Sequence, residues 1–574
     1  MQSVENKTNK LSFIHLHLLI LLLAGNCMVS YGQKSAYFIG ADKLLIDAND
    51  TPYNQVRPGD TLYFSGGNRL YLNIRNFHGK SGSPIVMINR NGAVIIDTDH
   101  YFGISIENCR FIQFTGTGDP AQHYGFQVNR VANGSGLGIG YLSSDFEIDH
   151  ISIKNTMIAG LYAKTDPNCS VTSTRASFTQ YNTSIHDNYI AYTGNEGLYV
   201  GSSKYTGQIV NCNGRDTLLM PGLLDGVKIY NNTIKYAGWD GIQVGSASKN
   251  CQIFDNTILY DSQANVDTQM SGILIGGGTR CDCYNNFISQ GNGDGIECLG
   301  LGGTRIYNNI IVDAGINYFP DNPAKMKYGI YVADTSVEKD SAFYLMHNNI
   351  LHPKSDGIRF SSILSKGSFI SSNVILMPGS YDYYEHGNTS FKGIDSYIMF
   401  QSKATVATVT NNYTERDAGS AGFESQKMDS PADFNLVKGS PLIDAVVYHP
   451  KTSVAFDFNH SPRPSGLKAD IGAFEFQFVT SSDAISKATE PSLLLIQNPS
   501  INLVSFKLPM GSDSSIDLKI FNLNGELIQE RRQFEKTADG AVIEANTSGW
   551  VDGIYLYTIY SDRQSYSGKF LKWQ

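Results

Sequence analysis

The middle of the chain repeats one pattern of apolar and polar positions. Short alternating apolar runs, such as Val227/Ile229, Ile234 and Ile242/Val244, are separated by Asn, Gly and Asp. A period of two with turn residues between the runs indicates β-strands, and no helical period is sustained. Because a unit of this kind cannot bury its apolar face alone, the pattern predicts that successive units stack into a solenoid.

Two landmarks set the register of the repeat. One is the second Asn of an Ile-x-Asn-Asn-x-Ile motif, which we place at Asn188, Asn232, Asn256, Asn286, Asn309, Asn349 and Asn373. The other is a Gly-Ile or Gly-Leu pair beginning at Gly197, Gly241, Gly272, Gly295, Gly329 and Gly357. The spacing predicts a unit of 23 or 24 residues that is interrupted by insertions. Stacked amides at one bend can satisfy one another, so we interpret the Asn column as structural.

A ladder of parallel strands with Asn at a recurring bend resembles the right-handed parallel β-helix of the pectate-lyase-like superfamily. The resemblance covers residues 36–475 and implies an all-β solenoid. We assign 33–432 to the β-helix with an N-terminal cap. Residues 433–479, with Gly-Ser-Pro-Leu-Ile-Asp and Asp-Ile-Gly-Ala-Phe-Glu motifs, resemble the closing segment of such proteins and are expected to cover the last coil.

Both ends of the chain predict export. Lys7 and Lys10, an apolar run over 11–24 and small residues after it indicate a cleaved signal peptide over 1–32. Residues 480–491 are polar and predict a linker. Motifs within 492–574, including Gly553-Ile554-Tyr555, resemble the C-terminal sorting domain of the type IX secretion system. This resemblance implies a small antiparallel β-sandwich, the type IX machinery as a partner, and an extracellular or outer-surface location.

Charge and hydropathy narrow the set of partners. The net charge is −9 and no basic block occurs, which disfavours a nucleic-acid partner because phosphate binding needs clustered Lys and Arg. No run after the leader reaches the ~18 to 20 apolar residues of a membrane span, so we predict no transmembrane segment. We expect a monomer.

Seven cysteines remain after the leader, in an oxidising compartment. Cys251 and Cys281 occupy the same slot in consecutive coils, where a strand spacing of ~4.8 Å allows a disulfide. Cys169 and Cys212 lie in successive insertions and form a second candidate pair that would clasp two loops. The apolar core slots hold two further cysteines, Cys283 and Cys298. We therefore interpret the Cys281-x-Cys283 motif as structural and not as metal-binding.

The candidate chemistry lies on the outward face of the Gly-Ile-x-Val strand. Ile and Val point inward, so the residue between them points out. Coil by coil this column reads Tyr162, Tyr199, Gln243, Leu274, Glu297, Tyr331 and Arg359, and the residues just before the Gly are Glu196, Asp240, Ser271, Asp294, Tyr328 and Asp356. Insertions at 165–181 and 202–223 follow the strand, and those at 259–271 and 313–328 precede it. We expect them to flank a groove that suits a polysaccharide chain.

Two catalytic schemes fit this groove. A glycoside hydrolase needs paired carboxylates, for which Glu196, Asp240 and Asp294 are the candidates. A lyase needs a base and a cation that neutralises a uronate, for which Lys164 is the candidate, with calcium held by nearby carboxylates. The substrate-binding candidates are Tyr162, Tyr199, Trp239, Gln243, Glu297 and Tyr331. No adjacent Asp-Asp pair or Gly-His-Gly of the polygalacturonase type occurs, so hydrolase and lyase stay open.

Structural alternatives stand beside these hypotheses. Asp before Gly is favoured at tight turns because it bonds to local backbone, so each acid is also a turn residue. His150 and His186 lie next to Asp149 and Asp187, which favours capping hydrogen bonds over catalysis. The protein as a whole competes with a non-catalytic glycan-binding or adhesin-like surface protein. Calcium is the one cofactor that we consider, and the sequence assigns no metal ligands.

Overall fold

The structure is a computed structural model. It describes residues 34–319, 326–379 and 396–477, and the segments 494–495, 502–508, 516–523, 525–532, 535–537, 540–561 and 565–572 of a C-terminal domain. The predicted signal peptide (1–32) and linker (480–491) lie outside the described residues. The described elements are strands and short 3-10 turns.

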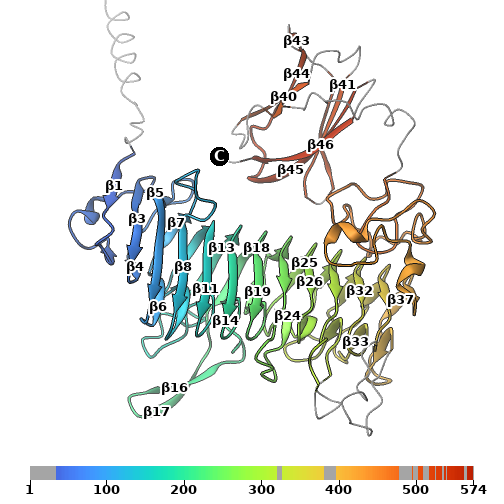
Figure 1. The fold of residues 1–574 in the computed structure, drawn as a ribbon, viewed down its shortest axis with the longest axis horizontal. Helices are drawn as coiled ribbons and strands as arrows, with labels where there is room; N and C mark the ends of the chain where they lie inside the picture. Colours follow the sequence, from blue (N-terminus) through green and yellow to red (C-terminus); the bar gives the residue numbers. More distant parts are fainter. Residues whose placement is uncertain are drawn as a thin grey trace, which may run out of the picture.

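The apolar repeats stack as parallel strands in three ladders, seen from blue to yellow in Figure 1. The first ladder contains the Gly-Ile-x-Val strands, and Ile242 pairs with Ile273, which pairs in turn with Ile296. Its strands are β2 (Leu45–Asp47), β4 (Leu72–Arg75), β6 (Phe102–Glu107), β9 (Ser135–Gly140), β12 (Leu161–Ala163), β15 (Leu198–Gly201), β20 (Ile242–Gly245), β24 (Ser271–Ile275), β27 (Asp294–Cys298), β30 (Ile330–Val332), β33 (Ile358–Phe360) and β36 (Ile398–Phe400). The parallel solenoid predicted from the pattern is confirmed.

The other two ladders lie before and after the Asn bend. The second consists of β1 (Ala36–Ile39), β3 (Thr61–Arg69), β5 (Ile85–Thr98), β7 (Arg110–Thr115), β10 (Ser144–Asp149), β13 (Thr179–His186), β18 (Leu223–Tyr230), β22 (Cys251–Phe254), β25 (Cys281–Tyr284), β28 (Thr304–Tyr307), β31 (Phe343–Met346), β34 (Phe369–Ser371) and β37 (Thr408–Thr410). The third continues from β5 through β8 (Phe126–Val131), β11 (Ile151–Thr156), β14 (Tyr189–Thr193), β19 (Thr233–Ala237), β23 (Thr257–Leu259), β26 (Phe287–Ser289), β29 (Ile310–Val312), β32 (Asn349–Leu351), β35 (Val374–Leu376) and β38 (Tyr413–Glu415). Inward Ile, Val, Leu and Phe of all three ladders form one continuous core.

The Asn column is a chain of buried amides along the bend. Asn256, for example, donates its amide to Asn286 Oδ1 at 3.0 Å and to two backbone carbonyls, and it accepts from Asn232. One predicted position is wrong: in the coil after Asn309 the ladder residue is Asn348, which lies two residues before the inward Ile as in the other coils. Asn349 instead accepts the backbone N–H of Ala473.

The closing segment packs along the side of the β-helix, which corrects the expectation that it covers the last coil. Its apolar side chains share a core with β26, β29, β32 and β35, and this core includes Phe287, Ile310, Leu351, Val374, Phe423, Phe434, Leu442 and Phe474. The short 3-10 turn η4 (Ala418–Ala421) precedes this segment, and η5 (Pro431–Phe434) leads into it. The outer face of the third ladder is apolar in these coils, so it needs a lateral cover.

The C-terminal domain is the predicted small antiparallel sandwich. One sheet contains β39 (Leu494–Leu495), β40 (Leu503–Leu508), β43 (Glu535–Thr537) and β44 (Gly540–Asn546), and the other β41 (Ile516–Phe521), β42 (Leu527–Arg531), β45 (Gly553–Ser561) and β46 (Ser565–Lys572). Val504, Phe506, Leu518 and Phe570 share its core. Among the described residues no helix is long and apolar enough to cross a membrane.

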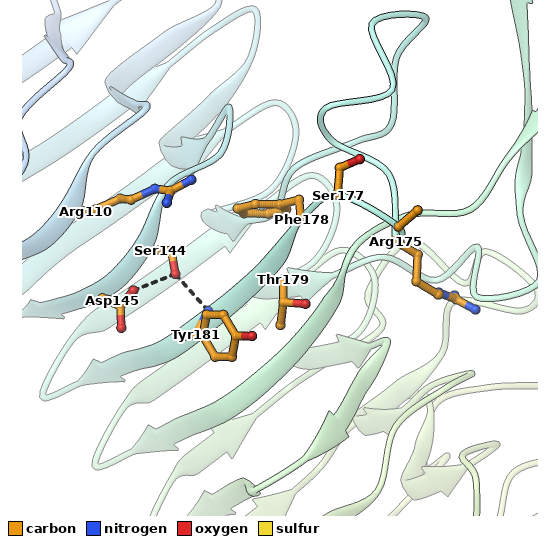
Figure 2. A pocket seen from close by; sticks show the side chains of 9 residues that line it. Arg110, Ser144, Asp145, Arg175, Ser177, Phe178, Thr179 and Tyr181 are labelled. Atoms are coloured by element: carbon orange, nitrogen blue, oxygen red, sulfur yellow. Dashed lines mark hydrogen bonds between the residues drawn. The ribbon is translucent and has the colours of Figure 1, made fainter.

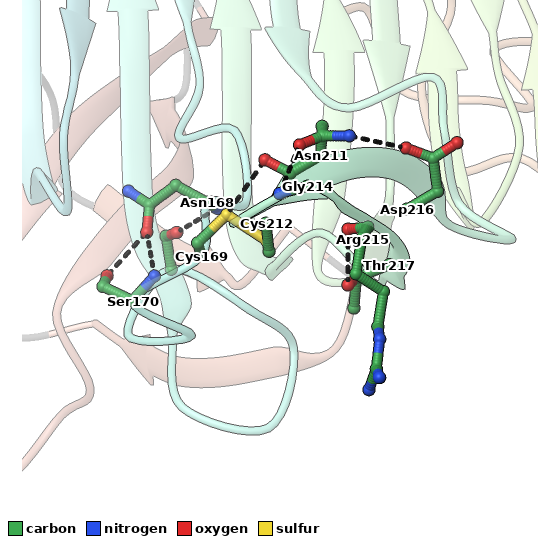
Figure 3. The surroundings of a disulfide bond; sticks show 10 residues. Asn168, Cys169, Ser170, Asn211, Cys212, Gly214, Arg215, Asp216 and Thr217 are labelled. Atoms are coloured by element: carbon green, nitrogen blue, oxygen red, sulfur yellow. Dashed lines mark hydrogen bonds between the residues drawn. A yellow bond between two sulfur atoms is a disulfide. The ribbon is translucent and has the colours of Figure 1, made fainter.

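The cysteines divide into one disulfide and a set of buried thiols. Cys169 and Cys212 are bonded, as predicted, and join the first insertion to the hairpin of β16 (Gln208–Cys212) and β17 (Arg215–Leu219) (Figure 3). The predicted Cys251–Cys281 disulfide is wrong, because both are free thiols although they are register partners. Side chains of in-register parallel strands stay about one strand spacing (~4.8 Å) apart, whereas disulfide Cβ atoms lie ~3.5 to 4.5 Å apart.

Candidate active site on the first ladder

The outward column of the first ladder has the register predicted from the sequence. Tyr162 pairs with Tyr199, then follow Gln243, Leu274, Glu297, Tyr331 and Arg359, one strand each. The acids before each Gly line up beside this column. The Asp240 carbonyl, for example, accepts the backbone N–H of Gly197 in the preceding coil, and the Glu196 carbonyl accepts that of Gly160. The structure therefore brings the candidate residues onto one face.

The centre of this face is an ion pair between Asp294 and Lys327. Lys327 Nζ lies 3.6 Å from Asp294 Oδ2, and both side chains are buried. Asp294 Oδ1 also accepts the backbone N–H of Tyr328 at 2.6 Å. Burial raises the pKa of Asp294, and Lys327 acts against this shift. Burial alone would lower the pKa of Lys327, but Asp294 and Glu297 raise it above its ordinary value, so its ammonium stays charged.

Glu297 is the carboxyl best poised to exchange a proton near neutral pH. It is half-buried on β27, and its Oε2 accepts the Ser271 hydroxyl from the neighbouring strand at 3.0 Å. Burial and the nearby Asp294 raise the pKa of Glu297 to about 7, while Lys327 acts in the opposite direction. A carboxyl with this pKa is protonated in a large fraction of molecules at neutral pH and can act as a general acid.

Asp240 is a buried carboxyl with no hydrogen-bond partner among the described residues. Its exposed fraction is 0%, and neither oxygen accepts a hydrogen bond. Burial, with Glu297, Glu196 and Asp261 nearby, holds the pKa of Asp240 well above its usual range. A buried carboxylate without donors is costly, so burial favours the neutral form of Asp240.

A fourth carboxyl comes from the insertion before β24. Asp261 is buried and accepts the Ser262 hydroxyl at 2.7 Å and the Gly293 N–H at 3.3 Å. Burial raises the pKa of Asp261 to about 6. Asp240, Asp261, Asp294 and Glu297 thus share a neighbourhood with one ammonium, that of Lys327. We call these five residues the acid cluster.

Lys164 and Glu196 lie on coils N-terminal to the acid cluster. Lys164 Nζ is 3.1 Å from Asp166 Oδ2 and lies over the ring of Tyr199, 4.6 Å from its centroid. Burial alone would lower the pKa of Lys164, but Tyr199, Asp166 and Glu196 raise it above its ordinary value. Burial raises the pKa of Glu196, and Lys164 opposes the shift. Lys164 is therefore a fixed cation and a poor base.

The predicted sugar-binding residues differ in how far they are buried. Tyr162 and Trp239 are half-buried, and Gln243 is buried with an oxygen that accepts no hydrogen bond in the described structure. Tyr331 packs against Tyr328 with ring centroids 5.4 Å apart. Two long insertions contribute to the same face. Asp261 lies in the one at 259–271, and Lys327 and Tyr328 end the one at 313–328.

A separate hollow of about 300 Å³ lies on the second ladder (Figure 2). Ser144 donates to Asp145 Oδ2 at 2.8 Å and accepts the Tyr181 N–H at 2.9 Å. Arg175 lines it too, but its guanidinium donates to the Tyr205 carbonyl at 2.6 Å. The hollow contains none of the acid cluster, so we place the site on the first ladder.

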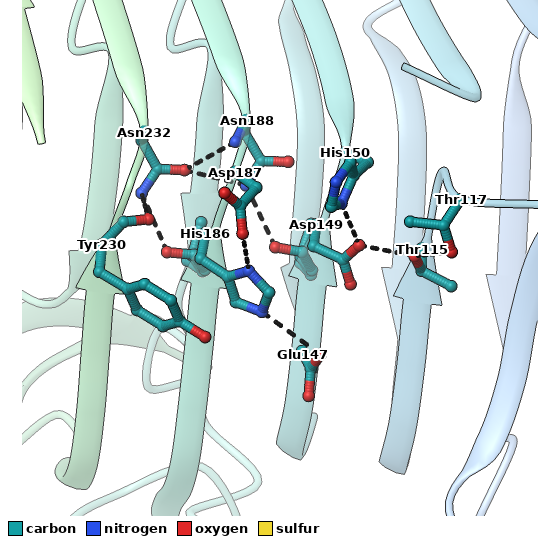
Figure 4. Close-up of polar contacts among 12 residues, drawn as sticks. Thr115, Thr117, Glu147, Asp149, His150, His186, Asp187, Asn188, Tyr230 and Asn232 are labelled. Carbon is teal, nitrogen blue, oxygen red and sulfur yellow. Dashed lines mark hydrogen bonds and ion pairs between the residues drawn. The ribbon is translucent and has the colours of Figure 1, made fainter. Parts of the chain in front are cut away.

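The two histidines form bend contacts, as expected. His150 Nδ1 lies 2.6 Å from Asp149 Oδ1, and His186 Nδ1 lies 2.7 Å from Asp187 Oδ2 (Figure 4). His186 also approaches Glu147 with its second ring nitrogen, at 3.3 Å. Both histidines lie on the second ladder or at its bend, away from the first ladder.

Sequence reasoning missed Lys327 and Asp261. Both belong to insertions, which have no period from which a side-chain direction can be inferred. A signal is nevertheless present in the sequence, because Lys327 lies two residues before Gly329 of its coil, next to the column of residues that directly precede each Gly. The ion-pair partner of Asp294 is therefore Lys327, which directly precedes Tyr328 in that column.

The fold and the C-terminal domain define a right-handed parallel β-helix protein with a type IX sorting domain. Residues 223–373 match the family described as right handed beta helix region, and residues 498–572 match the secretion system C-terminal sorting domain. The second match indicates export by the type IX system to the cell surface or the extracellular space. No curated protein matches the sequence significantly.

Solved structures with a related fold are remote. A GH136 lacto-N-biosidase from Eubacterium ramulus has a TM-score of 0.42 and 11% identity over 70% of this chain and 71% of its own. An alginate lyase from Paenibacillus sp. has a TM-score of 0.27 and 11% identity over 67% and 98%. The catalytic domain of a GH87 alpha-1,3-glucanase has a TM-score of 0.27 and 13% identity over 66% and 64%. At these values the likenesses carry no argument about substrate or mechanism.

Proposed function

We propose that this protein is an exported glycoside hydrolase that cleaves a glycan chain lying along the first ladder. The observation that carries the proposal is the pairing of two differently tuned carboxyls on one strand. Glu297 has a pKa of about 7, whereas Asp294 is held against the ammonium of Lys327. Neighbouring carboxyls in different environments are what acid and base roles at a glycosidic bond require.

In this mechanism Glu297 is the general acid. Its proton passes to the glycosidic oxygen as the bond from that oxygen to the anomeric carbon breaks, and the electron pair of the bond leaves with the oxygen. Glu297 is half-buried on the outward column, whereas Asp240 has an exposed fraction of 0%. Asp240 serves as a neutral buried acid that limits the negative charge beside Glu297.

Asp294 is the ionised partner. Lys327 and the Tyr328 N–H stabilise its carboxylate, which would either take a proton from the attacking water or attack the anomeric carbon itself. The separation of the two carboxyls in the substrate complex selects between these routes. In the first route water forms the new C–O bond, Asp294 takes one of its protons, and the transfer of that proton to Glu297 through solvent restores both groups. In the second route Asp294 forms the first C–O bond, and water then displaces it from the anomeric carbon while Glu297 takes a proton from that water.

The cations favour an acidic glycan. Lys164 and Lys327 remain charged, and Arg359 pairs with Asp356 at 3.2 Å beside Tyr328. Cations beside aromatic side chains can bind carboxylated or sulfated sugars, and a charged Lys164 suits this role better than the base role of a lyase. Lys327 also supplies the positive charge that calcium would bring to this site.

A product assay on a panel of polyuronates, sulfated glycans and neutral glycans tests the proposal. We expect new reducing ends without the ultraviolet absorbance of an unsaturated product, and no loss of activity in EDTA. Unsaturated products would replace the hydrolase with the lyase. Silence across the panel, with retention of the protein on one glycan in affinity electrophoresis, would favour the non-catalytic binder.

A further inference from the structure

A second cluster of ionisable groups lies on the second ladder and has no part in the proposed hydrolysis. Glu147 and Asp149 come from β10, and His186 ends the neighbouring strand β13, where it is the register partner of Asp149 (Figure 4). Each of the three residues offers one atom that can bind a metal, and these three atoms lie within 4.8 Å of one another. Among the described residues these three form the one group of His, Cys, Asp and Glu that meets this distance.

The ring of His186 is oriented as metal ligands usually are. Its Nδ1 lies 2.7 Å from Asp187 Oδ2, and its Nε2 lies 3.3 Å from Glu147 Oε1, a hydrogen bond that a bound cation would replace. Ligand atoms around a tetrahedral Zn²⁺ lie about 3.3 Å apart for bonds of about 2.0 to 2.1 Å. The ring also stacks on Tyr230, with centroids 4.4 Å apart. A carboxylate behind a ligating imidazole fixes its tautomer and raises its basicity.

The two carboxylates are held in the same way. Thr115 Oγ1 donates to Asp149 Oδ1 at 2.6 Å, with His150 on the same oxygen, and Gln113 donates to Glu147 Oε1 at 3.0 Å. These contacts fix the two carboxylates beside the imidazole of His186. The Glu147 side chain is 27% exposed, which gives a cation a path from solvent and leaves room for a water ligand.

One buried atom in the cluster lacks a partner. Asp149 is 3% exposed, and its Oδ2 accepts no hydrogen bond from any described residue. In Figure 4 this oxygen points away from Thr115, toward the side on which Glu147 lies. A buried carboxylate oxygen without a donor calls for a cation or an ordered water, and the groups around it are metal-ligand types.

We propose that Glu147, Asp149 and His186 bind a divalent transition-metal ion of the Zn²⁺ type, with water completing the coordination. One imidazole nitrogen with two carboxylates suits Zn²⁺, whereas Ca²⁺ prefers an all-oxygen shell of six to eight ligands. The ion would join β10 to β13 at the coil where the disulfide-linked insertions begin. The site is independent of the acid cluster, so its failure would not bear on the hydrolase proposal.

Isothermal titration of the full chain with ZnCl₂, after removal of metal with EDTA and then of EDTA, tests this site. We expect one Zn²⁺ per chain, and at least a tenfold loss of affinity in His186→Ala and in Asp149→Asn. Asp187→Asn, which changes only the group behind the imidazole, is expected to weaken binding less than His186→Ala. CaCl₂ is expected to give no binding that depends on His186.

The matched control is His352→Ala. His352 pairs with the carboxylate of Asp313, with its Nδ1 3.5 Å from Asp313 Oδ1, and lies outside the cluster. The His352→Ala variant should bind Zn²⁺ as tightly as the unmodified chain does. Far-UV circular dichroism should show that all variants are folded. The proposal is overturned if the unmodified chain takes up no Zn²⁺, or if His186→Ala binds it as tightly as His352→Ala does.

Discussion

The raised pKa of Glu297, in the acid cluster, lowers the free energy of unfolding of the protein when this carboxyl is ionised. Glu297 has a folded pKa of about 7, above the 4.5 of a free glutamate. The folded chain therefore binds this proton more tightly than the unfolded chain. The stability that Glu297 contributes is complete below pH 4.5 and is lost as the pH rises through about 7. Such a cost is expected where function requires a tuned group.

Replacing Glu297 with glutamine should stabilise the protein at alkaline pH. The raised pKa costs the folded state up to about 3 kcal/mol above pH 7, and the neutral amide avoids this cost. We expect the urea midpoint of Glu297→Gln to exceed that of the unmodified chain at pH 8 and to match it at pH 4.5. An equal midpoint at both pH values would mean that burial does not strain this carboxyl.

The Asn column makes the opposite contribution, because its hydrogen bonds are satisfied. Asn256→Ala removes the amide that serves Asn232 on one side and Asn286 and Ile229 on the other. Buried groups left without partners cost about 1 to 3 kcal/mol each, so we expect a loss of at least about 3 kcal/mol in urea unfolding. Asn133→Ala, at an exposed position, should change stability by less than about 0.5 kcal/mol. An equal loss of stability in Asn256→Ala and Asn133→Ala would contradict the structural role of the Asn column.

At the scale of elements, the strand columns could be predicted because alternation fixes which side chains face out. Tyr162, Tyr199, Gln243 and Glu297 all lie where their period placed them. The prediction failed in the insertions and at the bends, where no strand period shows which way a side chain points. Lys327 comes from an insertion, and the bend residue Asn348 was confused with its neighbour because two asparagines are adjacent. The strand register also could not predict that Cys251 and Cys281, although they are stacked partners, remain free thiols.

Thiol counting tests this part of the fold. After denaturation without reductant, we expect five alkylated cysteines among the described residues, Cys109, Cys251, Cys281, Cys283 and Cys298, and one disulfide-linked peptide pair joining Cys169 to Cys212. Mass spectrometry of the digested protein gives this count directly. Three alkylated cysteines with a Cys251–Cys281 peptide would restore the disulfide that the structure excludes.

At the scale of the whole molecule, the β-helix depends on a lateral cover pinned by one buried charge. Arg463 has a side-chain exposure of 0%, lies 3.1 Å from Glu475 Oε2 and donates to the Asp470 and Gly472 carbonyls. Its second terminal nitrogen approaches Asn308 of the β-helix bend. The sequence identified this segment by its motifs, but not its place, because apolar residues on the outer face of the third ladder look like core residues in a single repeat.

Removing this charge should detach the cover. Arg463→Ala leaves Glu475 buried without its cation, which costs about 3 to 5 kcal/mol, and exposes the apolar face of β26 to β35. We expect a lower thermal midpoint and new binding of a hydrophobic dye. Lys468→Ala, on the exposed surface of the same segment, should behave as the unmodified protein does. A dye signal that is unchanged in Arg463→Ala would contradict lateral packing of the segment.

The central claim is that Glu297 donates the proton that breaks a glycosidic bond, and the pH profile of kcat/KM on the first glycan that the protein cleaves tests it most directly. We predict a bell-shaped profile that falls above about pH 7 as Glu297 loses its proton and at acid pH as Asp294 gains one. Glu297→Gln should lose about 10²- to 10⁴-fold in kcat/KM, while Glu338→Gln, an exposed acid paired with Arg280, should keep the full profile. A Glu297→Gln variant that cleaves the glycan within twofold of the unmodified rate, with the same fall above pH 7, would contradict the account.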